Sequence, residues 1–210
     1  MEKSEFTILI GSFARGTGTQ ISDLDILRVG HNRSIQRPSN IDECIPVSYV
    51  DYEMDTFQKL HGDGSLFLYH AFYEGILLEG NKTTWMEYKN CFSVAEDFNT
   101  SIQEYLDVLS YIDNYPEYEK SVLPFLSNIY KCLKNIGVFR LASEKNYEFD
   151  KSLALEKGCG LDQETTNILV QANSVFERTT PVSSELMNEF ECYARILKLS
   201  LKETIRHNYQ

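Results

Sequence analysis

The sequence contains no Cys-x-x-Cys pair, the spacing that commonly marks a zinc site or a redox motif. Its cysteines are odd in number and widely scattered: Cys44, Cys91, Cys132, Cys159 and Cys192. This spacing is not typical of a metal site or of a small disulfide-bonded scaffold. We therefore expect reduced thiols in the core or at the surface.

Long apolar runs are also missing. A membrane-spanning helix needs roughly 18 to 20 consecutive apolar residues, and the sequence has no such stretch. Near the amino terminus only the run from Phe6 to Ile10 is apolar, which is too short for the core of a signal peptide. These absences predict a cytoplasmic protein without a membrane partner.

Positive charge is scarce. The 210 residues include 20 Lys and Arg against 31 Asp and Glu, a formal net charge of −11. This balance argues against a large surface for duplex nucleic acid and favours a cationic acceptor or a partner protein. A local basic pocket is compatible with it. With 42% hydrophobic and 24% charged residues and no internal repeat, the chain has the composition of a globular protein with an apolar core.

The first third of the chain has short β-branched apolar segments. Residues 6–10 end at Gly11, residues 24–29 follow a polar loop, and residues 45–52 are rich in Val and Tyr, so these segments predict three strands. From residue 54 the apolar spacing changes to the helical period, so residues 54–80 are expected to form helices that are broken at 62–64 and end near Gly80.

The rest of the chain is predicted to be helical. Four segments carry apolar residues three and four apart, which is typical of amphipathic helices: residues 94–114, 120–143, 163–178 and 184–206. We therefore expect an α+β protein, with a small mixed sheet and flanking helices in residues 1–92 and an α-helical bundle in residues 93–210.

One constellation points to chemistry. Gly11-Ser12 follows the first strand, and after ten further residues comes Asp23-Leu24-Asp25 at the start of the second. A Gly-Ser turn can present backbone amides and a hydroxyl to a phosphate. Side chains alternate along a strand, so Asp23 and Asp25 are expected on one face with Cα atoms about 7 Å apart. Mg²⁺ or Mn²⁺ would neutralise such a pair and take the phosphates of a nucleoside triphosphate as further ligands.

These residues resemble the hallmark of the DNA polymerase β-like nucleotidyltransferase superfamily, a strand, Gly-Ser, a spacer and Asp-x-Asp on the next strand. The ten-residue spacer is similar to that of the minimal nucleotidyltransferases, including those paired with HEPN toxins. The resemblance implies that Gly11 and Ser12 bind the triphosphate and that Asp23 and Asp25 bind the metal ions. Arg15 is a further candidate for phosphate binding, with a solvated loop arginine as the alternative.

The family also uses a third carboxylate on a later strand. We expect Asp51 to fill this position, as the aspartate best placed on the segment 45–52. Many relatives, however, have Pro-Val-Asp where this chain has Pro46-Val47-Ser48, so Ser48 is the alternative occupant. Asp42 and Asp55 are less favoured candidates.

His70 and Glu74 are four residues apart in a predicted helix. They could therefore pair with each other or line the cleft. The alternative for His70 is a buried histidine with a purely structural role.

The resemblance implies a metal-dependent enzyme that transfers a nucleoside monophosphate to a hydroxyl and releases pyrophosphate. Relatives act on small molecules, proteins or RNA or build oligonucleotides, and some belong to phage defence or toxin-antitoxin pairs. A partner protein encoded nearby is therefore expected. The alternative function is a catalytically weak, antitoxin-like module that binds a partner protein.

Overall fold

The computed structural model describes residues 5–19, 22–30, 45–111 and 122–208, with side chains up to residue 201. The chain divides into two compact units, Met1–Glu96 and Asp97–Gln210. The first unit contains a four-stranded sheet and the second is helical, so the expectation of an α+β protein is confirmed. The division falls close to the boundary expected from the sequence, between residues 92 and 93.

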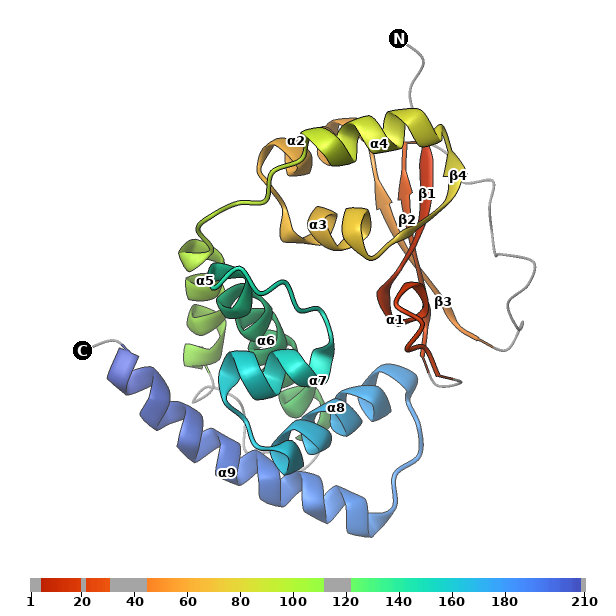
Figure 1. Ribbon diagram of the computed structural model, residues 1–210. Coiled ribbons are helices and arrows are strands. Elements are labelled where there is room, and N and C mark those ends of the chain that lie inside the picture. The colour runs from red at the N-terminus through yellow and green to blue at the C-terminus, as the bar shows by residue number, and fades with distance from the viewer. Residues whose placement is uncertain (1–4, 20–21, 31–44, 112–121, 209–210) are drawn as a thin grey trace. The chain divides into compact units, whose positions relative to one another are not determined.

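The sheet of the first unit is mixed and has the order β3-β2-β1-β4. Strand β1 (Phe6–Ile10) lies between β2 (Leu24–Val29) and β4 (Ile76–Gly80) and is antiparallel to both. Strand β3 (Val47–Tyr52) is parallel to β2. Because β1 is central and flanked on both sides, all five of its residues are buried (Figure 1).

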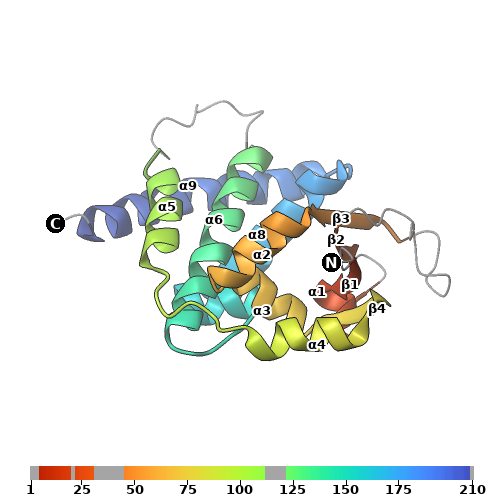
Figure 2. The ribbon, with the colours of Figure 1, turned by 90° about the horizontal axis from the view of Figure 1, so that it is seen from above.

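Three helices lie on the same side of these strands (Figure 1; Figure 2). They are α2 (Met54–Gly62), α3 (Leu66–Tyr73) and α4 (Lys82–Cys91). The fourth helix of the unit, α1 (Gly11–Ala14), is a single short segment directly after β1. Helix α4 begins where the side chain of Asn81 accepts hydrogen bonds from two backbone N–H groups of its first turn, a standard stabilisation of a helix start.

The core between the sheet and these helices is rich in aromatic side chains. Phe6 of β1 contacts Phe57 of α2 and Trp85 of α4, with ring centroids 6.2 and 5.2 Å apart. Phe72 of α3 lies 4.6 Å from Trp85 by the same measure. Aromatic rings bury large areas and favour tilted contacts of this kind. The first unit is thus held together by segments far apart in the chain.

The segment 76–80 corrects one prediction. It was expected to end a helix, but it forms the edge strand β4, paired with β1. Its apolar residues follow those of α3 after an interval of only two residues, so periodicity alone did not separate the two elements. The glutamate and glycine after α3, Glu74 and Gly75, form the break. Pairing with the central strand decides the conformation of this short segment.

The described residues of the second unit are mostly helical. Its helices are α5 (Asn99–Ser110), α6 (Val122–Ser143), α7 (Lys151–Leu153), the π-helical segment η3 (Ala154–Gly158), α8 (Gln163–Arg178) and α9 (Ser184–Asn208). Helix α8 has the bounds predicted from the sequence, and α6 and α9 lie close to theirs. Helix α5 begins at Asn99, later than the predicted start at residue 94. The helical turn formed by α7 and η3 was not predicted.

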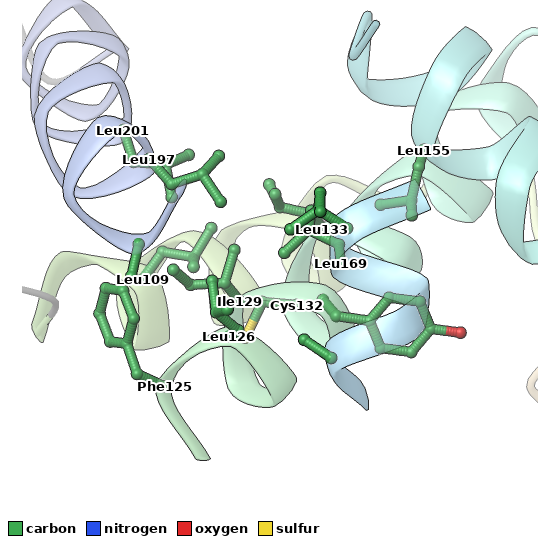
Figure 3. Packing of buried hydrophobic residues seen from close by; sticks show 14 of the residues in the cluster. Leu109, Phe125, Leu126, Ile129, Cys132, Leu133, Leu155, Leu169, Leu197 and Leu201 are labelled. Atoms are coloured by element: carbon green, nitrogen blue, oxygen red, sulfur yellow. The ribbon is translucent and has the colours of Figure 1, made fainter. Parts of the chain in front are cut away.

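Helix α6 is the centre of the second unit. Its buried residues pack against α5, α8 and α9 in one cluster, and Figure 3 shows leucines from these helices gathered there. At Gly137 the backbone of α6 approaches η3 so closely that a β-carbon would collide with the carbonyl oxygen of Ala154. A glycine is therefore required at this contact.

The sequence predicts neither a membrane-spanning helix nor disulfide bonds, and the structure bears on both only for the residues that it describes. Among them, no helix is long and apolar enough to cross a membrane. The four described cysteines, Cys91, Cys132, Cys159 and Cys192, are free thiols.

Candidate functional site

The turn after β1 is built around Gly11. This residue has a φ of +72°, which lies in the left-handed region that glycine adopts without steric penalty. The chain then forms the short helix α1, and the backbone N–H of Thr17 donates to the carbonyl oxygen of Ser12 over 2.9 Å. Ser12 is thus held in a closed turn at the end of a buried strand.

Asp25 lies directly against this turn. It is the second residue of β2 and pairs with Ile10, the last residue of β1. A β-carbon at Gly11 would collide with Oδ2 of Asp25, so the carboxylate packs against the bare α-carbon of the glycine. Two residues that are 14 positions apart in the sequence therefore meet at one end of the sheet, as the sequence predicts.

Asp23 has a different environment. It directly precedes β2 and is exposed, whereas Asp25 is half-buried. Residues 20 and 21, within the spacer, lie outside the described part of the chain.

The alternation of side chains along β2 gives the sheet two distinct faces. Asp25, Leu27 and Val29 share one face, and the two apolar residues belong to the cluster formed with α2, α3 and α4. Leu24 and Ile26 lie on the other face, in a separate cluster with partly buried residues such as Phe13. Asp25 is consequently on the face that the three helices cover.

Asp51 does not join Asp25, contrary to the sequence-based prediction. In the parallel pair, Asp51 lies across from Arg28, and its two carboxylate oxygens accept hydrogen bonds from the Arg28 guanidinium over 2.6 and 2.7 Å. Arg28 is three positions from Asp25 along β2, so it points to the opposite face. Asp51 is therefore held there as well.

Ser48 occupies the position across from Asp25. It is exposed and lies on the same face as Asp25. In the sequence, Ser48 was the alternative to Asp51 for the third position of the site. Of the two less favoured candidates, Asp55 is an exposed residue in the first turn of α2. Asp42 lies outside the described residues.

Two polar side chains, one in α3 and one directly after it, contact the Gly11 turn. The backbone N–H of Gly11 donates to Nε2 of His70 over 3.1 Å. Arg15, which follows α1, donates from Nη1 to Oε2 of Glu74 over 3.2 Å. Nδ1 of His70 lies 2.7 Å from the same Glu74 oxygen. The contact between His70 and Glu74 is one of the two alternatives that the sequence left open for them. The bond from Gly11 to His70 was not predicted.

The hydrogen bonds of His70 define its protonation. Since Nε2 accepts from an N–H group, it carries no proton, and the remaining ring proton lies on Nδ1 and is donated to Glu74. Burial lowers the pKa of His70 below its ordinary value, although the Glu74 carboxylate opposes this effect. The histidine is thus neutral, with only 8% of its surface exposed.

The donor set limits which metal site the described residues can form. Nowhere among the described residues do three or more His, Cys, Asp or Glu side chains lie close enough together to hold a metal ion. Mg²⁺ is commonly held by one or two carboxylates, with water and substrate phosphates as the remaining ligands. Asp23 and Asp25 supply two carboxylates, the number that this mode of binding needs, whereas Asp51 lies on the other face of the sheet and adds no third.

Comparison with known protein families and with curated proteins found no match for this chain.

Proposed function

We propose that the first unit is a nucleotidyltransferase head of the DNA polymerase β-like type, which binds a nucleoside triphosphate and a divalent metal ion. The observation that carries the proposal is the packing of the Asp25 carboxylate against the Gly11 turn. A metal ligand and a phosphate-binding turn must be adjacent if one ion is to bridge protein and triphosphate. The small mixed sheet with helices on one face agrees with this type of head.

In this proposal each residue at the turn has one task. Asp23 and Asp25 hold Mg²⁺ or Mn²⁺, and Ser12 with the backbone of the turn receives the phosphates. The metal ion, when bound, neutralises charge on the triphosphate. Arg15 adds positive charge near the turn, although its guanidinium is paired with Glu74.

The proposed reaction is the transfer of a nucleoside monophosphate. The oxygen of an acceptor hydroxyl forms a bond to the α-phosphorus, and the bond from that phosphorus to the oxygen bridging to the β-phosphate breaks. Pyrophosphate leaves with the electron pair, and the hydroxyl proton passes to a carboxylate or to water. The acceptor class is a protein, RNA, a small molecule or a growing oligonucleotide. A role in phage defence or a toxin-antitoxin pair is part of the same proposal.

The experiment is an incubation of the protein with labelled ATP, CTP, GTP and UTP, and their deoxy forms, in Mg²⁺ or Mn²⁺. Products without an added acceptor would identify the base preference, self-modification and oligomer synthesis. The variant D23A/D25A should lose transfer while its circular dichroism stays that of the wild type. Transfer that persists in this variant would contradict the proposal.

A second function is favoured by one specific observation, the serine across from Asp25. With Ser48 in place of a carboxylate and Asp51 paired to Arg28 on the other face, the metal site has fewer protein ligands than the resemblance implies. This favours a catalytically weak module that acts by binding a partner protein.

The substitution Ser48→Asp distinguishes the two functions. It adds a carboxylate on the face and at the register position of Asp25, so a weak transferase should gain metal affinity and turnover by about tenfold or more, the reverse of the loss seen when metal-site groups are removed. Ser48→Asn is the matched control, since it adds similar bulk without charge. If neither the wild type nor Ser48→Asp forms product, the binding function is supported.

A further inference from the structure

His70 of α3 and Glu74, the residue after α3, bind the two ends of the Gly11 turn. Gly11 is the first residue of α1, and Arg15 directly follows its last. The former donates to His70 and the latter to Glu74, in each case across 59 positions of sequence. Because His70 and Glu74 are joined to each other by a 2.7 Å contact, the four residues form one connected set around Ser12.

The partners of His70 are more specific than those that a buried histidine requires. Any hydrogen-bond partners can satisfy the two ring nitrogens of a histidine with a purely structural role. His61 in the same unit is an example, since its Nε2 lies within 2.8 Å of the carbonyl oxygen of Tyr88. His70 instead accepts from the N–H group of Gly11, which has a left-handed conformation and lies against Asp25. Its two hydrogen bonds also require a single tautomer, with the proton on Nδ1.

The occupied N–H group has a consequence for the ligand. Gly11 already donates its backbone hydrogen to His70, so a phosphate that enters the turn meets the Ser12 hydroxyl and the following amides. Holding such donors in place before the ligand arrives reduces the entropy lost on binding.

We propose that His70 is a positioning residue that, together with Glu74 and Arg15, fixes the Gly11–Ser12 turn in the conformation that receives the nucleotide phosphates. The role in phosphate binding rests on the proposed function. The role in fixing the turn rests on the hydrogen bonds alone.

The first test uses the wild-type protein without nucleotide. Long-range proton–nitrogen NMR spectra report which ring nitrogen of His70 carries hydrogen, and the expected result is protonated Nδ1 with unprotonated Nε2. In the variant His70→Gln, the Gly11 amide should keep a hydrogen-bonded chemical shift, since the side-chain oxygen can replace Nε2 as acceptor. A proton on Nε2 in the wild type would overturn the proposal, whatever the protein binds.

The second test measures Mg²⁺-ATP affinity by titration calorimetry. His70→Phe removes both hydrogen bonds and should weaken binding about tenfold, as loss of outer-sphere positioning groups typically does. His70→Gln should restore most of that affinity. His61→Phe is the matched control, since it removes a partly buried histidine of the same unit that does not contact the turn, and it should leave the affinity unchanged.

The outcomes separate the two proposals. Equal affinity of His70→Phe and the wild type, with both proteins folded, would overturn the positioning role. If His70→Phe does not fold, His70→Gln decides, because a bonded Gly11 amide and retained affinity are both required of it. If the wild type binds no nucleoside triphosphate, the proposed function and the role of the turn in phosphate binding are both overturned. The tautomer measurement would still test the hydrogen bond from Gly11 to His70.

Discussion

The two units differ in where their polar groups lie. In the first unit a buried histidine, a glutamate and an arginine surround a glycine turn, and the carboxylate of Asp25 packs against the same turn. In the second unit the core cluster consists of apolar side chains, and a described buried polar contact there joins Ser127 to Asn173 within the bundle. Among the described residues, the connected polar set next to Asp25 thus belongs to the first unit, which is where we place the proposed site.

Backbone conformation repeats this contrast. Among the described glycines with positive φ, five belong to the first unit and one to the second: Gly11, Gly16, Gly30, Gly64 and Gly80 against Gly160. Of these, Gly11, Gly30 and Gly80 lie at the ends of strands, where a positive φ lets the chain turn sharply. The glycine that matters in the second unit, Gly137, serves close packing instead.

The largest expected effect tests the packing role of the second unit. In Gly137→Ala the new β-carbon collides with backbone of η3, so the free energy of unfolding should fall by about 2–3 kcal/mol, as overpacking typically causes. Circular dichroism during urea unfolding would measure it. The control is Gly62→Ala in α2, where no atom lies within 4 Å of the new β-carbon, and a gain of about 0.5 kcal/mol is expected.

The single tryptophan makes this test specific to one unit. Trp85 is buried in the core of the first unit, so its fluorescence reports the unfolding of that unit. Gly137→Ala should lower the helix signal at urea concentrations where fluorescence is unchanged. Unaltered stability of the helix signal would show that the close contact at Gly137 is not required.

The next effect compares two glycines of the turn. Gly11 and Gly16 have φ values of +72° and +73°, so alanine should cost about 1 kcal/mol of strain at either site. At Gly11 the β-carbon also meets the end of the Asp25 side chain, whereas no atom lies within 4 Å at Gly16. Gly11→Ala should therefore displace the carboxylate and weaken Mg²⁺-ATP binding about 10- to 100-fold.

Gly16→Ala is the matched control for this measurement. Calorimetric titration should give wild-type affinity for it, with a similar loss of stability. Equal affinities for the two alanine variants would show that the position of Asp25 does not matter for the ligand.

How far the sequence predicted this site depends on the distance between the residues. Strands β1 and β2 have the predicted bounds, and the Gly-Ser turn meets Asp25 as expected, because these residues are local in the chain and follow strand geometry. The bond from Gly11 to His70 spans 59 positions and depends on how α3 packs on the sheet. The spacing of His70 and Glu74 was the one available indication.

The face of the sheet on which Asp51 lies shows a second limit of prediction from the sequence. Alternation fixes which residues of one strand share a face, but the register between two strands decides which of them lie opposite each other. Parallel pairing places Ser48 beside Asp25 and Asp51 beside Arg28. No residue pattern within 45–52 reports that register, so the sequence left both candidates open.

A smaller effect is expected on the stability of the second unit at alkaline pH. Burial, with a further contribution from Asp150, raises the pKa of Tyr130 from 10.0 to about 12. Above pH 10 the unfolded chain therefore loses this proton before the folded one, so stability falls as pH rises from about 10 through 12. Tyr130→Phe should remove about 1 kcal/mol of this loss near pH 11, measured by urea unfolding at several pH values.

The smallest effect is expected at Asp51 and distinguishes the two faces of the sheet. The Arg28–Asp51 pair joins two neighbouring strands, but the carboxylate side chain is 52% exposed, and exposed ion pairs contribute about 0–1 kcal/mol. Arg28 also lies 4.1 Å from the centre of the Tyr49 ring, a contact that survives the substitution. Asp51→Asn should therefore lower stability by less than about 1 kcal/mol and leave nucleotide binding and transfer at wild-type values.

Asp25→Asn makes the same chemical change on the other face of the same strand pair, next to the Gly11 turn. It should abolish transfer while altering stability little. The pair of variants thus separates a carboxylate that joins two strands from one that binds a ligand. If Asp51→Asn also abolished transfer, the carboxylate would have to reach the site from the opposite face, and the register that places Ser48 beside Asp25 would be contradicted.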